Sequence, residues 1–160
     1  MWGFMTHGAI QVRAEIRNAL VPLPALSIEA IAPTTIPANW RWMRRVLSKA
    51  IEADPDRDDS DVYEDLCNAR MSAFVVGGES QGVIVTQTIG DWLWVIYAAG
   101  ALGDIAAILG LMRGIEHAAQ QRGLTEIHIV GRRGWARPLA ALGFNARPSS
   151  DGLFHIWKVL

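Results

Sequence analysis

The sequence has little that could crosslink the chain or give it an overall charge. Its 160 residues include one cysteine, Cys67, which excludes a disulfide within the chain and fits a reducing compartment. The formal net charge of −1 gives no general attraction to nucleic acid or to an anionic membrane. No apolar run reaches the roughly 20 residues that span a bilayer, and residues 1–13 lack the basic and apolar regions of a signal peptide. We therefore expect a protein of the cytoplasm, or of a particle assembled there, with no membrane partner.

Apolar residues, by contrast, are abundant. They make up 51% of the chain and charged residues 19%, which is enough apolar material for the core of a single domain. We place this domain at residues 24–160 and treat residues 1–23 as an N-terminal arm, in which 9–20 could form a short helix. The tryptophans are numerous for this length, and packing in the core explains most of them better than an exposed platform for a partner does. The seven are Trp2, Trp40, Trp42, Trp92, Trp94, Trp135 and Trp157.

Hydrophobic periodicity and turn residues predict the element order β-α-α-β-β-β-α-β-α-β-β. The second helix follows an acidic stretch at 54–65, with Ser60 or Asp61 as its N-cap. A long helix then connects the strand at 91–100 to the strand at 125–130, so these two strands should be parallel neighbours. Strands are expected at 25–31, 71–78, 81–89, 91–100, 125–130, 143–150 and 153–160, and helices around 40–51, after 60, and at 104–122 and 134–142.

The C-terminal third carries a family resemblance. Residues 127–144, IHIVGRRGWARPLAALGF, combine a strand, a short helix and a closing Gly-Phe. With the element order of residues 25–160, this ending resembles the GCN5-related N-acetyltransferase (GNAT) superfamily, and most of all the short GNAT-like proteins of tailed phages and prophages. The resemblance implies a three-layer α/β fold, in which helices cover both faces of a mixed, mostly antiparallel sheet of six to seven strands.

The resemblance also implies a place for a cofactor. In active members, acetyl-CoA enters a gap between the strands that correspond to 91–100 and 125–130, and its pyrophosphate lies on amides at the start of the next helix. This sequence departs from the family's phosphate loop, because the two glycine positions fall on Ala106 and Ile108. Asp104 is expected to cap the helix, so its carboxylate would occupy the amides that a pyrophosphate needs. If the protein is an enzyme, acetyl-CoA or coenzyme A would contact Ala99, Gly100, Leu102, Gly103, Asp104 and Ile105.

The candidate catalytic residues are Tyr97, His128 and Glu29. Many active members have a tyrosine about one turn before the closing Gly-Phe, where it protonates the departing thiolate, but this chain has Leu139 there. Tyr97 is a candidate substitute. The unperturbed pKa of histidine, near 6.5, suits His128 to accept a proton from an amine, and alternation along the strand would allow Glu126 to pair with it. The other candidate bases are Glu29, Glu79 and Asp91. No spacing of histidine or cysteine indicates a metal site.

A basic cluster lies in the short C-terminal helix and just before it. Arg132, Arg133 and Arg137 surround Trp135 in the sequence. These four residues could contact the adenosine phosphates of a cofactor, bind the acidic surface of a protein partner or, with Trp135 stacking on bases, bind nucleic acid. In the simpler alternative, the arginines are solvated and Trp135 anchors the helix to the core. Because the stretch 54–65 has the opposite charge, the cluster could also support self-association or docking among virion components.

Three functions are consistent with these features. We favour a GNAT-like protein that is catalytically weak or inactive and acts as a virion or assembly component. The alternative is an active acetyl-CoA-dependent N-acyltransferase that acts on an amine. A nucleic-acid-associated protein is supported only by the local arginines.

Overall fold

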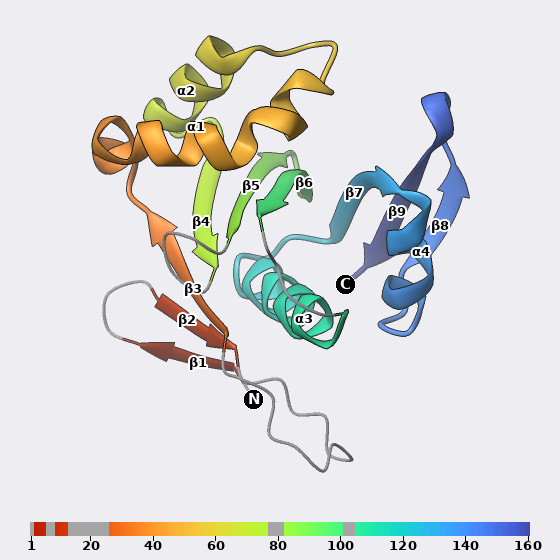
Figure 1. Cartoon of the computed structure of the whole chain (residues 1–160). Coiled ribbons are helices and arrows are strands. Elements are labelled where there is room, and N and C mark those ends of the chain that lie inside the picture. The colour runs from red at the N-terminus through yellow and green to blue at the C-terminus, as the bar shows by residue number, and fades with distance from the viewer. Residues whose placement is uncertain (1, 6–8, 13–25, 77–81, 101–104) are drawn as a thin grey trace.

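The computed structural model describes residues 2–5, 9–12, 26–76, 82–100 and 105–160, and the strands in these ranges form one sheet (Figure 1). The strands are β1 Trp2–Met5, β2 Ala9–Val12, β3 Leu26–Ile31, β4 Ser72–Val76, β5 Gly82–Ile89, β6 Trp92–Gly100, β7 Glu126–Arg132, β8 Asn145–Pro148 and β9 Leu153–Val159. The helices are α1 Ile36–Glu52, α2 Asp59–Cys67, α3 Ile105–Gln121 and α4 Arg133–Ala140, with 3₁₀ turns η1 Pro33–Thr35 and η2 Ser150–Gly152. The strand order is β1-β2-β3-β4-β5-β6-β7-β9-β8.

From β3 onward, the elements follow the order that the sequence predicts. Seven of the strands belong to this part, so the expected mixed sheet with helices on both faces is confirmed. β6 and β7 are parallel, as the crossover through α3 requires, and the other neighbouring pairs are antiparallel.

The N-terminal arm contributes two further strands. β2 pairs with β3 and β1 pairs with β2, which extends the sheet at this edge. The helix expected at 9–20 is therefore wrong at Ala9–Val12, and residues 13–20 lie outside the described part of the chain. The physical reason is that Ile10 and Val12 are β-branched and favour an extended backbone, and the edge of β3 offers them a template.

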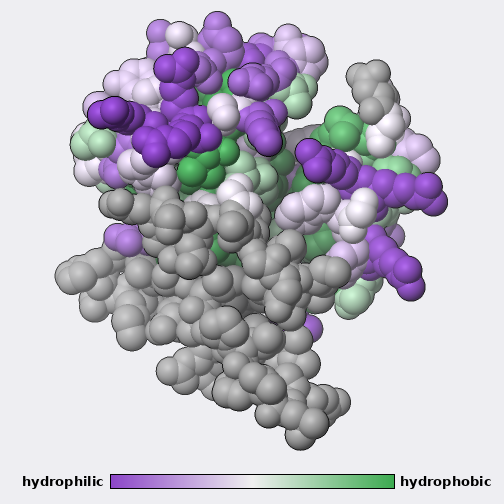
Figure 2. All heavy atoms as spheres, in the orientation of Figure 1, coloured by the Kyte–Doolittle hydropathy of each residue, from purple (hydrophilic) through white to green (hydrophobic). Residues whose placement is uncertain are grey.

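The sheet separates two apolar cores. On one face, α1 and α2 bury Met43, Leu47 and Val62 against Val83 and Val85 of β5. The apolar side of α1 recurs at steps of three and four residues, which is why one stripe of this helix is fully buried. Figure 2 shows the consequence on the outside, where hydrophilic side chains gather over α1 and α2.

The second core lies on the opposite face, beneath α3 and α4. It includes Leu111 and Met112 of α3 and Leu139 of α4, which pack with Ile127 of β7 and Ile156 of β9. α3 ends where Gly123 adopts a positive φ of 72°, and the Leu124 N–H then donates to the carbonyl of Ala119. None of the helices described here is both long enough and apolar enough to cross a bilayer.

Several carboxylates of the acidic stretch 54–65 have partners within the chain. Arg44 pairs with Asp59, and Arg70 pairs with Asp65 at 2.6 Å. The N-cap of α2 is Asp58, not Ser60 or Asp61, because the Asp58 carboxylate accepts hydrogen bonds from the backbone N–H groups of both these residues. The Asp61 carboxylate in turn accepts from the backbone N–H of Asp58, which completes a capping box.

This capping box gives a first prediction. Asp58→Ala should lower the free energy of unfolding by about 1 kcal/mol, because two amides at the start of α2 lose their acceptor. Urea denaturation measures the change. Asp56→Ala is the matched control, because it removes the same charge from the same loop without touching the cap. Equal losses in the two variants would mean that net charge, and not the cap, is responsible.

Candidate functional site

β6 and β7 are paired along only part of their length. The pairing runs from Trp92 opposite Glu126 to Val95 opposite Ile129, whereas β6 continues to Gly100 and β7 to Arg132. Beyond Val95, the edge of β6 that faces β7 therefore has no ladder partner in β7. The sheet opens at the place where the family resemblance expects an acyl-CoA.

A β-bulge lies at the start of this opening. Val85 of β5 is opposite Tyr97, but the next residue, Thr86, is opposite Val95, so Ile96 is the additional residue in β6. Val95 packs in the core beneath α3, and strict alternation would direct Tyr97 to the same side. The additional residue instead places Tyr97 in the core beneath α1.

Tyr97 is held by the loop between α1 and α2. Its side chain is buried, and its hydroxyl donates a 2.5 Å hydrogen bond to Oδ2 of Asp54. Burial and this hydrogen bond both raise the pKa of Tyr97. Burial also acts to raise the pKa of Asp54, but it is outweighed by the hydrogen bonds from Tyr97 and the backbone of Asp56 and by the charge of Arg57, so the pKa of Asp54 is lowered. Tyr97 is thus a neutral phenol whose proton already has an acceptor.

Removing the hydroxyl of Tyr97 tests its hydrogen bond to Asp54. We expect Tyr97→Phe to lower the free energy of unfolding by about 2 kcal/mol at pH 7, because a mostly buried carboxylate loses a hydrogen bond. Because the pKa of Asp54 is lowered from its ordinary 3.8, this contribution is present above pH 3.8 and is lost as the pH falls through the folded value. Urea denaturation at pH 7 and at pH 3 measures both effects. Tyr63→Phe on α2 is the control, and a deficit in Tyr97→Phe that is unchanged at pH 3 would contradict the account.

A cluster of aromatic rings lies beside the last paired residues of β6 and β7. His128 of β7 is 4% exposed, and its ring lies 4.6 Å from the rings of both Trp92 and Trp94. Its Nε2 is 2.8 Å from Oε2 of Glu126, which confirms the pairing that alternation predicts. Its Nδ1 is 2.9 Å from Nε2 of His155 on β9. Glu126, His128 and His155, which we call the histidine chain, thus form a continuous series of hydrogen bonds across two strands.

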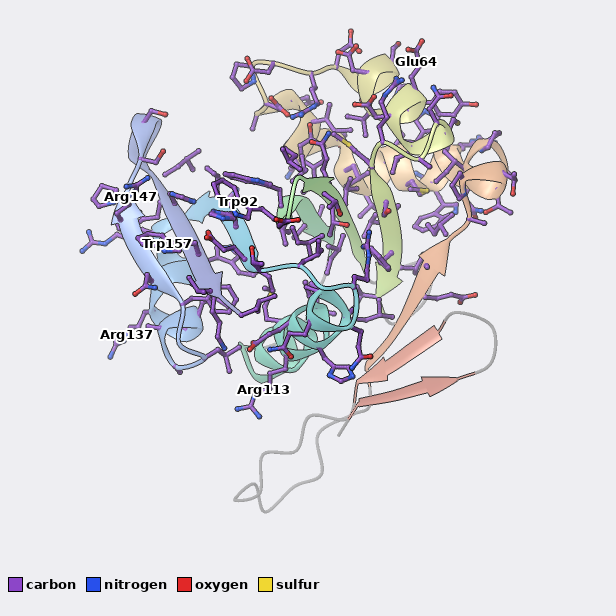
Figure 3. All side chains as sticks on the ribbon, turned by 180° about the vertical axis from the view of Figure 1, so that it is seen from behind. Glu64, Trp92, Arg113, Arg137, Arg147 and Trp157 are labelled. Carbon is purple, nitrogen blue, oxygen red and sulfur yellow. The ribbon has the colours of Figure 1, made fainter. Side chains whose placement is uncertain are left out.

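The histidine chain lies on the same sheet face as α1 and α2, on β7 and β9 beside the part of the face that these helices cover. The strand registers place the following large apolar residues on this face, and each is at least 36% exposed: Ile89, Trp92, Val130, Leu153 and Val159. Trp157 of β9 and Arg147 of β8 continue this face toward the edge of the sheet (Figure 3). The guanidinium carbon of Arg147 lies 5.5 Å from the centroid of the Trp157 ring. An exposed apolar area of this kind marks a binding surface more often than chance exposure does. We call it the tryptophan face.

The other predicted catalytic residues lie apart from the histidine chain. Glu29 is exposed on β3, and β4 and β5 separate it from β6. Asp91 lies in the turn before β6, where its backbone carbonyl accepts a hydrogen bond from the N–H of Thr125. Glu79 lies outside the described residues. No group of histidine, cysteine, aspartate and glutamate suited to holding a metal ion occurs among the residues that the structure describes.

Of the predicted cofactor residues, the structure describes only those at the two ends of the segment. Ala99 and Gly100 are the last residues of β6, and Gly100 has a positive φ of 108°. Ile105 is the first residue of α3. Leu102, Gly103 and the Asp104 cap lie outside the described residues, so the expected competition between a carboxylate and a pyrophosphate stays a prediction.

The structure separates the predicted basic cluster. Trp135 packs against the core beneath α3 and α4, as the simpler alternative expects. Arg132 is placed by the register of β7 on the same face as His128 and Val130. Arg133 and Arg137 are exposed on α4, and Figure 3 shows Arg137 pointing away from the sheet. The four residues therefore do not form a single surface centred on Trp135, and whether they bind a partner stays a prediction.

Sequence reasoning did not find His155 as a member of this site. His155 and Trp157 alternate in β9 and therefore share a face, which is a signal that the sequence contains. Their neighbours are residues of β7, and only the pairing of β9 with β7 brings His155 to His128. That pairing joins residues 27 positions apart.

No protein-family model and no curated protein sequence matches the chain. Solved structures of acetyltransferases do match its fold. An aminoglycoside 6'-acetyltransferase type Ii matches with a TM-score of 0.62 and 13% identity, over 82% of this chain and 96% of the other. The ribosomal-protein-S18-alanine N-acetyltransferase from Escherichia coli matches with a TM-score of 0.58 and 18% identity, over 84% and 93%. The PaiA N-acetyltransferase from Thermoplasma acidophilum, in complex with coenzyme A, matches with a TM-score of 0.57 and 9% identity, over 86% and 100%. At such identities the likeness shows the GNAT-like fold alone.

Proposed function

We propose that the protein is an N-acyltransferase that takes its acyl group from an acyl-CoA thioester and transfers it to an amine. The observation that carries this proposal is the divergence of β6 from β7 beyond Val95 and Ile129, which begins at the bulge at Ile96. The histidine chain beside the opening adds groups that can move a proton.

The open edge of β6 fits the extended part of an acyl-CoA. Backbone N–H and C=O groups that lack a strand partner hydrogen-bond readily to an added extended chain, and an acyl-CoA carries amides in such a chain. Ile96 to Gly100 would hold it, and the phosphate end would approach residues 101–105, of which the structure describes only Ile105. When bound, the thioester supplies an activated carbonyl carbon.

Titration with acetyl-CoA tests the proposal directly. We expect heat of binding in calorimetry and a rise of the unfolding temperature with ligand concentration. Adenosine alone is the control, because it lacks the amide-bearing chain. Release of free thiol on addition of a panel of amines then measures turnover. The absence of heat at millimolar acetyl-CoA would contradict the proposal.

A second candidate function is that of a non-catalytic component of a tailed-phage particle. Leu139 supports it, because this residue stands where active GNAT members place their tyrosine and is fully buried, so α4 presents no hydroxyl there. The exposed tryptophan face also suits contact with other proteins. Mass spectrometry of purified virions would detect the protein. Its absence from particles would remove this candidate, whereas its presence together with failed acetyl-CoA binding would favour it.

A further inference from the structure

We infer, on the basis of the proposed acyltransferase function, that the tryptophan face is the site of the acceptor. It takes an amine that carries a planar apolar group, and Nδ1 of His155 accepts the proton of that amine. His128 and Glu126 act behind His155 as positioning residues.

The direction of hydrogen bonding in the histidine chain follows from the carboxylate. An ionised carboxylate only accepts hydrogen bonds, so His128 must present its Nε2–H to Glu126. In the neutral ring of His128, Nδ1 then carries the lone pair, and it must accept the Nε2–H of His155. The second nitrogen of a neutral His155, Nδ1, keeps its lone pair. No described residue donates a hydrogen bond to that atom.

His128 itself cannot easily serve an external amine. It is 4% exposed, it lies between two tryptophan rings, and both of its nitrogens are engaged within the protein. His155 is half-buried, and its ring stacks at 6° to the ring of Trp94. The histidine chain therefore ends at His155, the more accessible histidine. In this arrangement a second histidine and a carboxylate orient His155 as a base.

His155 also lies at the level where the sheet opens. Its partner in β7 is Val130, the residue directly after Ile129, and Ile129 is the last residue of β7 that pairs with β6. Val130, which lies opposite His155 in the ladder, is 44% exposed. A proton acceptor is thus placed next to the mouth of the opening in which the thioester is proposed to lie.

The surroundings of His155 favour its neutral form. Burial, the neighbouring His128 and the guanidinium of Arg147 all lower the pKa of His155 from its ordinary 6.5. The other titratable or charged residues that the strand registers place on this face are Glu126 and Arg132 of β7 and, beyond the bulge in β6, Tyr97. At neutral pH, His155 consequently has a free lone pair, and a proton that it takes up can be relayed to His128 beside the carboxylate.

The shape and chemistry of the tryptophan face indicate the class of acceptor. Trp92 on β6 is 42% exposed. Trp157 lies on the same face, on β9, with β7 between the two strands. Flat indole surfaces favour a planar apolar group, and their electron-rich faces also attract an ammonium before it loses its proton. Arg147 already covers one side of Trp157, which disfavours a second cation at that position.

In the chemical step, the amine nitrogen forms a bond to the thioester carbonyl carbon and the carbon–sulfur bond breaks. The proton lost by nitrogen passes to Nδ1 of His155, with the Nε2 proton of His155 free to shift to His128. The thiolate takes up one proton from His155 through solvent, so an amide and a free thiol are the products.

Two measurements test this inference. In the protein without ligand, NMR titration should show His155 titrating below 6.5 in the parent, and at still lower pH in Glu126→Gln, because the carboxylate no longer stabilises a proton on the chain. In the acyl-transfer assay, His155→Gln should lower kcat by about 10²- to 10⁴-fold with an unchanged affinity for acetyl-CoA. The acidic limb of the pH profile should move to lower pH in Glu126→Gln. His117→Gln on α3 is the matched control.

The outcomes separate this inference from the function on which it rests. No binding of acetyl-CoA and no turnover by the parent would overturn both. Turnover by the parent that survives in His155→Gln within threefold, or a His155 titration that does not respond to Glu126→Gln, would overturn the inference alone. Equal kcat/KM for phenethylamine and for an aliphatic amine of similar basicity would overturn the assigned class of acceptor.

Discussion

Leu139→Ala is expected to lower the free energy of unfolding by roughly 2 to 5 kcal/mol. Leu139 is fully buried on α4, where it belongs to the core formed with α3 and the C-terminal strands. Truncation removes apolar contacts and leaves a cavity that the surrounding strands cannot fully close. Chemical denaturation, followed by tryptophan fluorescence, measures the loss.

Arg137→Ala provides the control for Leu139→Ala, because Arg137 is exposed on the same helix. Its effect should stay within about 0.5 kcal/mol. A loss below about 1 kcal/mol in Leu139→Ala would show that α4 is not anchored through this residue. The same burial bears on function, because a tyrosine substituted here would need room that a packed core does not offer.

His128→Phe is expected to have the second-largest effect on stability, a loss of about 2 to 3 kcal/mol. Phenylalanine keeps an aromatic ring between Trp92 and Trp94 but removes both ring nitrogens. The Glu126 carboxylate, whose side chain is only 27% exposed, then loses its hydrogen-bond donor, and His155 loses its acceptor. Thermal and urea denaturation at pH 7 measure the loss.

A double-mutant cycle shows whether this loss arises from the histidine chain. Glu126→Gln combined with His128→Phe should cost less than the sum of the two single changes, by about 1 kcal/mol or more, because the second change removes a carboxylate that has already lost its partner. Additive losses would mean that His128 and Glu126 contribute independently. That result would also weaken the role of Glu126 as a positioning residue for His155.

Sequence reasoning predicted the features that depend on local patterns. Alternation in β7 placed Glu126 and His128 on one side of the strand, and the structure pairs them at 2.8 Å. The length of α3 between β6 and β7 required a crossover, which made those strands parallel. Periods of two and of three to four residues are properties of the backbone itself, so they can be followed along a single chain.

The features that sequence reasoning missed depend on contacts between distant segments. The bulge at Ile96 exchanged the face of Tyr97, and the partner of its hydroxyl, Asp54, lies 43 positions away. The N-cap of α2 is Asp58 and not the predicted Ser60 or Asp61. Several neighbouring acidic residues could cap this helix, and the cap is the one whose carboxylate reaches the free amides. Neither outcome follows from a local period.

By itself, then, the sequence determined the order of the elements, the apolar faces that bury them and the pairing of neighbours on one strand, because each depends on residues a few positions apart. Only the tertiary structure decided that β6 parts from β7 after Val95, that β9 brings His155 to His128, and that Arg132 and Trp135 belong to opposite faces. The physical reason is that strand register joins residues far apart in the chain, and a register is fixed by the packing of the whole sheet and its helices.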